Sequence, residues 1–264
     1  MLDTTKTLSI IYIHYKNEEF LRKSILSLQG KMGKGVDFEI LVSNNDEEST
    51  LDSFRNDFSS VKIINHRKNV GYGAGNNLGA KEAKGKYLWF LNADTEVIAP
   101  KMEIVRSVFE KDSAVGVVGS RLITLSGKNQ EWSAGYEIGF WNLIRNNLGF
   151  PKSRSLWSSQ MMKDVDWVSG ASFFIARDLF FALQGFDEKI FMYFEDMDLC
   201  KRVRKTGRKV LYLPQSEVMH IGGGSFKNSE AQKKNYYDSQ EYYFKKHKPY
   251  WQYAAVRILR KVFL

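Results

Sequence analysis

Apolar runs alternate with helical periods along the first hundred residues. The apolar runs predict four buried strands, at residues 8–15, 37–43, 61–66 and 86–91. Helices are expected between them, at residues 18–30, near 48–58 and near 76–84. In the first helix, Leu21, Ile25 and Leu28 recur on one face. Strands that alternate with helices are typical of an α/β domain with a mostly parallel sheet.

The second half of the chain has a weaker pattern. Strands are expected at residues 114–123, 169–177 and 209–214, and helices at 100–111, 195–207 and over most of the chain end from about 235. Pro100 suits the first position of a helix, because its φ angle is already helical. Acids in the first turn of the 195–207 helix and bases in its last turn complement the helix dipole, and Gly207 can close it. Residues 127–165 mix Trp, Asn, Ser and Gly without a clear period, so we assign no element there.

The composition favours a single α/β domain. The chain has 264 residues, 43% of them hydrophobic, and no Pro-, Ser- or Gly-rich linker divides it. The single Cys200 rules out an intramolecular disulfide and favours a reducing compartment. The first twenty residues lack the order of a signal peptide, and no apolar run approaches the ~20 residues of a membrane span. We therefore expect a cytoplasmic protein.

The net charge indicates an anionic partner. A formal charge of +9 attracts phosphorylated ligands, acidic lipid surfaces and nucleic acids alike. None of the standard nucleic-acid signatures is present in the sequence, so we expect no nucleic-acid partner.

Two motifs follow predicted strands. In LNAD, Asp94 lies where the strand at 86–91 ends, and ligands of open α/β sheets gather at the carboxyl ends of strands. A carboxylate there can hold a divalent cation, which in turn binds a diphosphate; the alternative is an Asp that caps a turn. GYGAGNN, at residues 71–77, lacks the spacing of a dinucleotide fingerprint and follows the third strand, not the first. We interpret it as a glycine-rich loop that lets backbone approach a ligand, or else as a plain turn.

Two later motifs carry ionisable groups. His220, in VMHIGGGS, can complete a metal site with Asp94, although a lone His is more often structural. In FMYFEDMDLCKR, an aromatic run meets Glu195, Asp196 and Asp198. These acids can supply a catalytic base, or they can merely start a helix and pair with the bases that follow.

Taken together and in order, the motifs resemble the family 2 glycosyltransferases of the GT-A fold. The resemblance covers roughly residues 7–225 and is most specific in NVGYGAGNN, GKYLWFLNAD, DWVSGASFFIAR, GFDEKIFMYFEDMDLCKR and H-x-G-G-G. The full series looks like the bacterial subgroup that contains many rhamnosyltransferases of O-antigen and capsule assembly.

The resemblance implies a metal-assisted donor site. Asp94 matches the residue that holds Mg²⁺ or Mn²⁺ against the donor diphosphate, and His220 matches a downstream metal or diphosphate ligand. Asn92 replaces the first Asp of the family's D-x-D motif, and Ser43 stands where an Asp usually reads the nucleobase, with Asn44, Asn45 or Asp46 as substitutes. The expected donor-binding residues are Tyr15, Asn17, Ser43, Asn44, Asn45, Gly71, Tyr72, Gly73, Asn76, Asn92 and Asp94.

The resemblance also assigns the catalytic base to Asp196, with Glu195 as the alternative base. Asp198 is assigned a structural role, because residues two apart on a helix do not face each other. Trp167, Gly170 and Glu195 are expected on the acceptor side, and Trp167 is equally suited to the core. The implied reaction is a single inverting displacement of a nucleoside diphosphate.

The expected function is therefore glycosyl transfer from a nucleotide sugar, with dTDP-rhamnose favoured, in cell-surface polysaccharide synthesis. A UDP-hexose or a galactofuranose nucleotide is the nearest alternative donor. A non-catalytic carbohydrate-binding subunit would not need Asp94, Asp196 and His220 together. A nucleotidyltransferase would be expected to carry a glycine- and lysine-rich loop after the first strand, where this chain has HYKNEEF.

The chain divides by pattern into residues 1–226, the GT-A domain, and a basic, aromatic tail at 227–264. The mixture of Lys/Arg with Trp/Tyr/Phe in the tail is typical of an interfacial helix, so an anionic membrane surface and a polyprenyl-diphosphate-linked acceptor are expected at the inner face of the plasma membrane. A tail docked on the protein itself or on a second subunit is the alternative.

Overall fold

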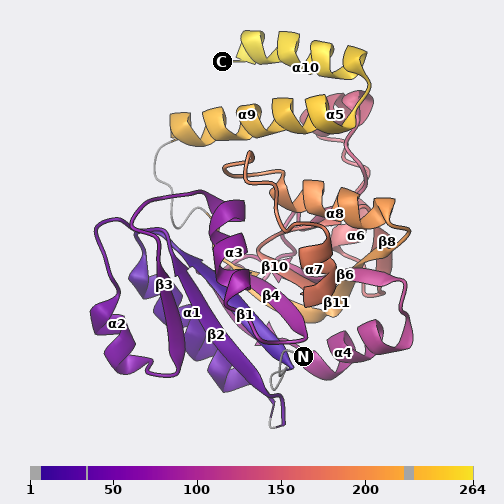
Figure 1. The fold of residues 1–264 in the computed structure, drawn as a ribbon. Coiled ribbons are helices and arrows are strands. Elements are labelled where there is room, and N and C mark those ends of the chain that lie inside the picture. Colours follow the sequence, from indigo (N-terminus) through magenta and orange to yellow (C-terminus); the bar gives the residue numbers. More distant parts are fainter. Residues whose placement is uncertain (1–6, 34, 223–228, 264) are drawn as a thin grey trace.

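The computed structural model describes residues 7–33, 35–222 and 229–263, which form helices around a central sheet (Figure 1). The nine strands of the sheet include a path in the order β3-β2-β1-β4-β10-β6-β11-β5, and β8 pairs with β11 off this path. The bounds are β1 Leu8–His14, β2 Phe38–Asn44, β3 Val61–Asn65, β4 Tyr87–Asn92, β5 Thr95–Ala99, β6 Val115–Ile123, β8 Lys163–Val165, β10 Ser172–Ala176 and β11 Lys209–His220. Six strands (β1 to β4, β6 and β11) run in one direction and β5, β8 and β10 run in the other, which confirms a mostly parallel sheet.

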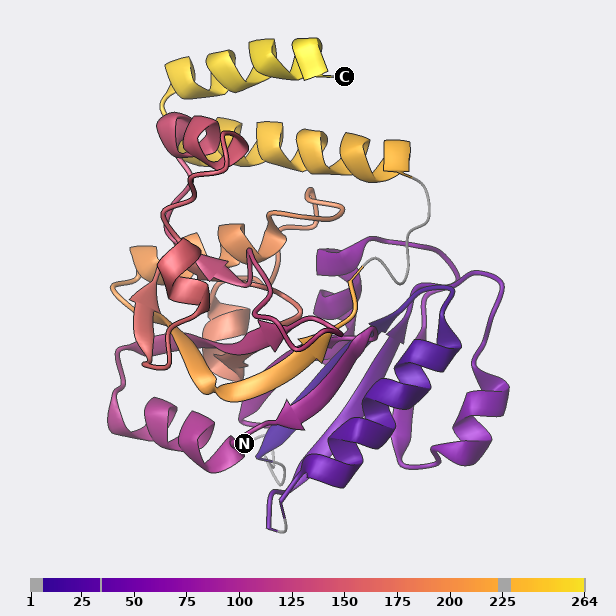
Figure 2. The ribbon, with the colours of Figure 1, turned by 180° about the vertical axis from the view of Figure 1, so that it is seen from behind.

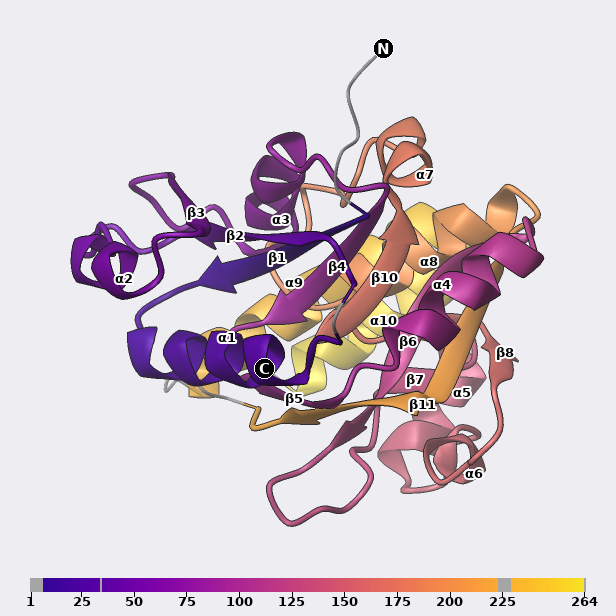
Figure 3. The same ribbon diagram turned by 90° about the horizontal axis from the view of Figure 1, so that it is seen from below.

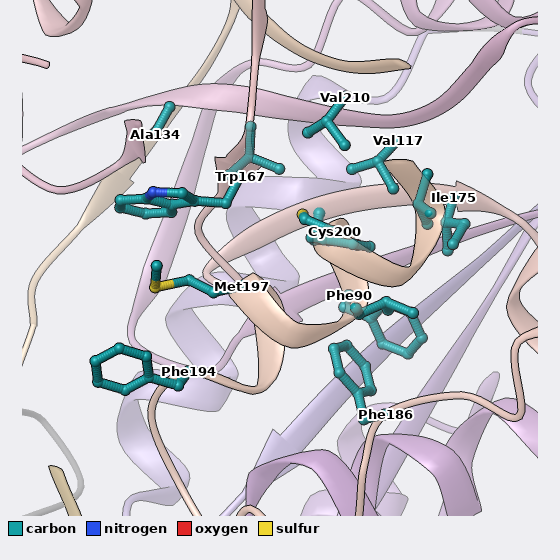
Figure 4. Packing of buried hydrophobic residues seen from close by; sticks show 14 of the residues in the cluster. Phe90, Val117, Ala134, Trp167, Ile175, Phe186, Phe194, Met197, Cys200 and Val210 are labelled. Carbon is teal, nitrogen blue, oxygen red and sulfur yellow. The ribbon is translucent and has the colours of Figure 1, made fainter. Parts of the chain in front are cut away.

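Helices cover both faces of the sheet because successive strand residues point to opposite sides. In β1, Ile10 and Tyr12 belong to one buried cluster and Ile11 belongs to the other. The first cluster is covered by α1 (Glu18–Lys31), α2 (Asp52–Asp57) and α4 (Met102–Lys111), the second by α3 (Tyr72–Lys81), α7 (Arg177–Ala182) and α8 (Glu195–Lys205). Figure 4 shows part of the second cluster, where Phe90 and Phe186 lie beside each other and Trp167 lies near Met197.

Four details of the sequence prediction were wrong. Helix α3 begins at Tyr72 and not at 76, so the glycine motif is itself helical. Helix α4 begins at Met102, after Lys101 with φ +46°, so Pro100 lies outside it. Strand β5 was not predicted; it pairs with β11 and lies against α1 (Figure 3). Strand β11 does not stop at 214 but continues to His220 past an irregularity between Leu213 and Glu217.

The segment at 127–165, left unassigned from the sequence, contains short elements. They are β7 (Ala134–Gly135), which pairs with β9 (Trp167–Val168), the helices α5 (Phe140–Asn147) and α6 (Arg154–Trp157), and β8, which pairs with β11. The segment therefore leaves the sheet, forms α5 beside the chain end, and returns (Figure 2).

The chain end forms two helices instead of one, α9 (Ser229–His247) and α10 (Tyr250–Phe263). Pro249 separates them, because the residue before a proline is pushed out of helical backbone angles. Tyr243 and Phe244 of α9 and Val256 of α10 are buried in the same cluster as α8. Among the described helices, none has the length and apolar character needed to cross a bilayer.

Candidate active site

A cavity of about 530 Å³ lies at the carboxyl ends of β1 and β4 and extends to α5, α8 and α9. Most of the residues expected at the site line it: Tyr15, Asn45, Gly71, Tyr72, Asn92, Asp94, Trp167, Gly170, Glu195, Asp196 and His220. Residues far apart in sequence that were expected to bind donor, metal and acceptor or to act as base thus line one cavity, whose volume suits a small-molecule ligand.

Five expected donor residues lie outside the cavity lining. Asn17 caps α1, where its Oδ1 accepts from Phe20 N at 3.3 Å. Ser43 is buried between His66 Nε2 and Gly75 O, both at 2.6 Å from its Oγ. The side chains of Asn17 and Ser43 thus form hydrogen bonds within the fold and do not face the cavity.

The other three belong to β2 and to α3. Asn44 contacts His14 Nδ1, and donates to Asn65 Oδ1 and to Ser49 O. Gly73 packs closely on Phe186, and a Cβ at Gly73 would lie 3.0 Å from that side chain. Asn76 is buried within α3. Of the four residues considered for the nucleobase, only Asn45 lines the cavity.

Asp94 and His220 meet because β11 pairs with β5, which places His220 opposite Thr95. Asp94 Oδ1 lies 3.3 Å from His220 Nε2, and Ile221 N donates to Asp94 O at 2.9 Å. His220 Nδ1 lies 3.1 Å from Gln130 Oε1, and His220 Nε2 lies 3.4 Å from Asn92 Nδ2. When Nδ1–H donates to Gln130, the lone pair of Nε2 faces Asp94 and the Asn92 amide. Gly223 and Gly224 of the H-x-G-G-G motif lie outside the described residues.

The donor set fits Mg²⁺ or Mn²⁺. The carboxylate oxygen of Asp94 suits both ions, whereas the imidazole nitrogen of His220 favours the transition metal Mn²⁺ over Mg²⁺, a hard cation that prefers oxygen ligands. Within the described part of the chain, no group of three or more His, Cys, Asp or Glu side chains gathers as a metal site. Two protein ligands leave room for phosphate oxygens, which is how Mg²⁺ is commonly held at phosphate-binding sites.

The glycine loop is fixed against the loop that precedes α8. Gly71 has φ +88°, and a Cβ at this position would lie 2.5 Å from Phe191 O. Asn45 Nδ2 donates to Gly71 O at 3.0 Å, and Tyr72 N donates to Phe191 O at 2.8 Å. Only glycine combines this backbone angle with so close an approach, so the loop shape depends on Gly71.

The acids at the start of α8 are held by an unusual backbone. Tyr193 and Phe194 both have positive φ, +68° and +66°, although neither is glycine. Such angles persist when the surroundings fix them, and they cluster at functional sites. Here the buried Phe194 ring packs on Tyr236 and Tyr243 of α9.

Asp196 and Glu195 differ in their hydrogen bonds. Asp196 Oδ2 accepts from Gly170 N at 2.9 Å, and its Oδ1 accepts from Met197 N at 2.7 Å. Glu195 is buried, and its Oε2 has no hydrogen-bond partner among the described residues. Burial raises the pKa of Asp196, while the two backbone N–H groups oppose that shift. Burial, and then the charge of Asp196, raises the pKa of Glu195 well above its usual range. Asp196 is therefore the more readily ionised of the two.

Glu195→Gln is expected to stabilise the protein, and increasingly so as pH rises. The pKa of Glu195 in the folded protein lies above its unfolded value of ~4.3. The folded protein therefore loses stability as pH rises from the unfolded pKa to the folded pKa. A neutral Gln has no such loss, so the variant should melt higher at pH 8 and converge with the parent near pH 4. Melting curves across this pH range check the result. A variant that melts lower at every pH would contradict it.

Beside Trp167, which was expected on the acceptor side, the cavity is lined by residues that the sequence did not single out. Trp167 lines the cavity, and its Nε1 donates to Tyr136 O at 3.2 Å. Trp132, Asn146 and Tyr236 join the lining from the unassigned segment, from α5 and from α9. For Trp132 and Asn146, the only indication in the sequence was the frequent Trp and Asn of residues 127–165.

Comparison with known proteins identifies the family. The Glycosyl transferase family 2 profile matches residues 9–169, more than half of the chain. O-antigen biosynthesis protein RfbC of Myxococcus xanthus is 29% identical over 231 residues, which are 82% of this chain and 17% of RfbC. The N-acetylglucosaminyl-diphospho-decaprenol L-rhamnosyltransferase of Mycobacterium tuberculosis (strain H37Rv) is 43% identical over 58 residues, 22% of this chain and 19% of that protein. The chain thus spans less than a fifth of the length of either relative.

A solved structure shares the fold. The crystal structure of GalNAc-T7 with UDP, GalNAc and Mn²⁺ matches with a TM-score of 0.66 at 19% identity, over 84% of this chain and 44% of that one. This likeness confirms the GT-A architecture expected from the sequence. The chain belongs to glycosyl transferase family 2.

Proposed function

We propose that this protein is an inverting, metal-dependent glycosyltransferase of bacterial cell-surface polysaccharide synthesis. The observation that carries the proposal is the shared cavity, which Asp94, His220 and Asp196 all line. A protein that only bound carbohydrate would need neither a pair of cation ligands nor a buried carboxylate in the same cavity.

In the proposed reaction, Asp196 accepts the proton of an acceptor hydroxyl as the hydroxyl oxygen attacks the anomeric carbon. The bond from that carbon to the donor diphosphate breaks, the configuration inverts, and the nucleoside diphosphate departs. Positioned general bases typically contribute 10²- to 10⁴-fold. A cation held by Asp94 and His220 would offset the negative charge of the diphosphate.

The favoured donor is dTDP-rhamnose, and the favoured acceptor is a saccharide on polyprenyl diphosphate. The name of the Mycobacterium tuberculosis relative, which describes L-rhamnosyl transfer to N-acetylglucosaminyl-diphospho-decaprenol, supports the rhamnosyl group and the lipid-linked acceptor, while the dTDP nucleotide rests on the resemblance of the motifs. A UDP-hexose or a galactofuranose nucleotide remains the alternative donor. The proposed place of action is the cytoplasmic face of the plasma membrane.

Thermal stabilisation by nucleotides tests the donor site. With Mn²⁺, dTDP at ~100 times its Kd is expected to stabilise the protein by about 2.7 kcal/mol, more than UDP, GDP or CDP. Chelation should abolish the shift, and Asp94→Ala should likewise abolish the shift that nucleotide gives in the presence of Mn²⁺. Asp178→Ala, a change at an exposed acid of α7, serves as the matched control.

The pattern of shifts separates the alternatives. A larger shift with UDP would keep the enzyme and change the donor. No shift with any nucleotide would contradict the transferase and favour the binding subunit, and an unchanged metal-dependent shift in Asp94→Ala would move the cation to other residues.

A further inference from the structure

The positive charge of the chain is concentrated in two segments. Residues 138–163 and 242–264 hold ten of the 39 Lys and Arg residues and no Asp or Glu. The whole chain carries +9, so the remaining residues sum to −1. Four of the ten bases, Lys246, Lys248, Arg257 and Arg260, pair with acids of other segments, and the other six form no ion pair within the described part of the chain.

The two segments meet in the fold. Phe140 N, at the start of α5, donates to Gln252 Oε1 of α10 at 3.0 Å, and the Phe140 and Trp251 rings lie 6.0 Å apart. Figures 1 and 2 both show α5 beside the turn between α9 and α10, with α10 as the outermost layer.

Large apolar side chains are exposed on the same helices. Trp141, Leu148 and Phe150, in and after α5, are 67–68% exposed, and Trp251 and Ile258 of α10 are 52% and 65% exposed. Arg145 and Arg257 are exposed among them. We name these seven residues the basic aromatic surface. Its mixture of rings, aliphatic groups and guanidinium groups suits an interface between water and anionic lipid.

Each helix has its opposite face turned toward the protein. In α10, Val256 is buried and Tyr253 packs on the core, whereas Ile258 is exposed and Arg257 is exposed beside Glu241 of α9, 3.7 Å from its carboxylate. In α5, Leu143 and Asn146 line the active-site cavity. Helix α5 therefore lies between the basic aromatic surface and the cavity.

We propose that the basic aromatic surface docks on an anionic lipid bilayer, so that α5 separates the bilayer from the cavity and a lipid-linked saccharide reaches Asp196 past its edge. The choice of acceptor rests on the proposed function; the docking itself does not. The sequence pattern placed membrane contact in the chain end alone, and the structure adds α5. A second copy of the chain is a poorer occupant, because a symmetric contact would bring the same positive charges together.

Flotation with lipid vesicles tests the docking. The protein is expected to float with vesicles of 70% phosphatidylcholine and 30% phosphatidylglycerol at low salt, and not with pure phosphatidylcholine. Arg145→Gln/Arg257→Gln should weaken binding roughly thirty-fold, at about 1 kcal/mol for each base near the surface. Trp141→Ser/Phe150→Ser/Trp251→Ser should weaken it at least ten-fold.

The control is Leu26→Ser/Leu125→Ser, which removes two exposed leucines elsewhere on the protein and should leave flotation unchanged. Equal flotation of all variants, or no flotation of the parent, overturns the proposal. A dimer in sedimentation that the aromatic variant loses would assign the surface to a second copy and also overturn it. The nucleotide-dependent melting shift is measured on every variant and should persist, so failure of docking and failure of the proposed function give different results.

Discussion

Replacing Asp196 with Asn is expected to lower the transfer rate at saturating substrates by roughly 10²- to 10⁴-fold and to leave nucleotide binding within a few-fold of the parent. The carboxamide has nearly the same shape but cannot take a proton from the acceptor hydroxyl. One of the two backbone donors, Gly170 N or Met197 N, must then face the amide nitrogen, so a modest loss of stability accompanies the change. Single-turnover transfer from a radiolabelled donor measures the rate, and the nucleotide-dependent melting shift measures binding.

Glu195→Gln is the matched control, since it neutralises the neighbouring acid in the same cavity. It should retain far more transfer than Asp196→Asn, and the reverse order would assign the base to Glu195. The pH profile gives a second readout. A base works only when ionised, so the rate falls as pH drops through its pKa; because burial raises the pKa of Asp196, this fall should begin above the ordinary Asp value of ~3.9.

The strands of the sheet were predictable where burial on both faces makes the sequence continuously apolar. Strands β1, β2 and β4 are such runs, and each was located to within a residue or two. Strand β5 was missed because it is five residues long and follows LNAD directly, which hides its start. The end of β11 was missed because Pro214 cannot donate to a ladder and normally marks a strand edge, whereas here β11 continues past it with an irregular register.

The site was predictable as far as its motifs lie at strand or helix ends. Asp94, His220 and Asp196 were each placed by a local pattern, and the fold brings them to one cavity. Ser43 and Asn44 also lie at a strand end, but their side chains form hydrogen bonds with His66 and His14. No local sequence pattern reveals these tertiary contacts. Asn146 and Tyr236 come from helices that reach the cavity only through tertiary packing.

Asp198→Asn is expected to destabilise the fold by about 3–5 kcal/mol, because it removes the acid from a buried cluster of charges. Asp198 is fully buried, and its Oδ1 accepts from His247 Nε2 and Lys246 Nζ, both at 2.6 Å, while Oδ2 accepts from Arg202 Nε at 2.7 Å. These contacts tie α9 to α8 and hold the pKa of Asp198 far below its usual range. The amide of Asn keeps only one acceptor oxygen, so either Arg202 or the Lys246–His247 pair must face its NH2 group, and the negative charge that offsets Lys246 and Arg202 is lost. Urea unfolding at pH 7 measures the change.

Asp112→Asn is the control for charge alone, because Asp112 pairs with Lys209 in a half-exposed ion pair that is worth no more than about 1 kcal/mol. The stability that Asp198 contributes also depends on pH, in a direction that its pKa predicts. A carboxyl whose folded pKa is depressed stabilises the fold above its unfolded pKa of ~3.9, and this contribution is lost as pH falls toward the folded value. The difference between the parent and Asp198→Asn should therefore be full at pH 6–7 and shrink in acid. Since α9 also carries Tyr236 into the cavity, the loosened variant should bind acceptor less well and nucleotide normally. An Asp198→Asn variant as stable as Asp112→Asn would show that α9 is held by its apolar contacts with α8 and not by this carboxylate.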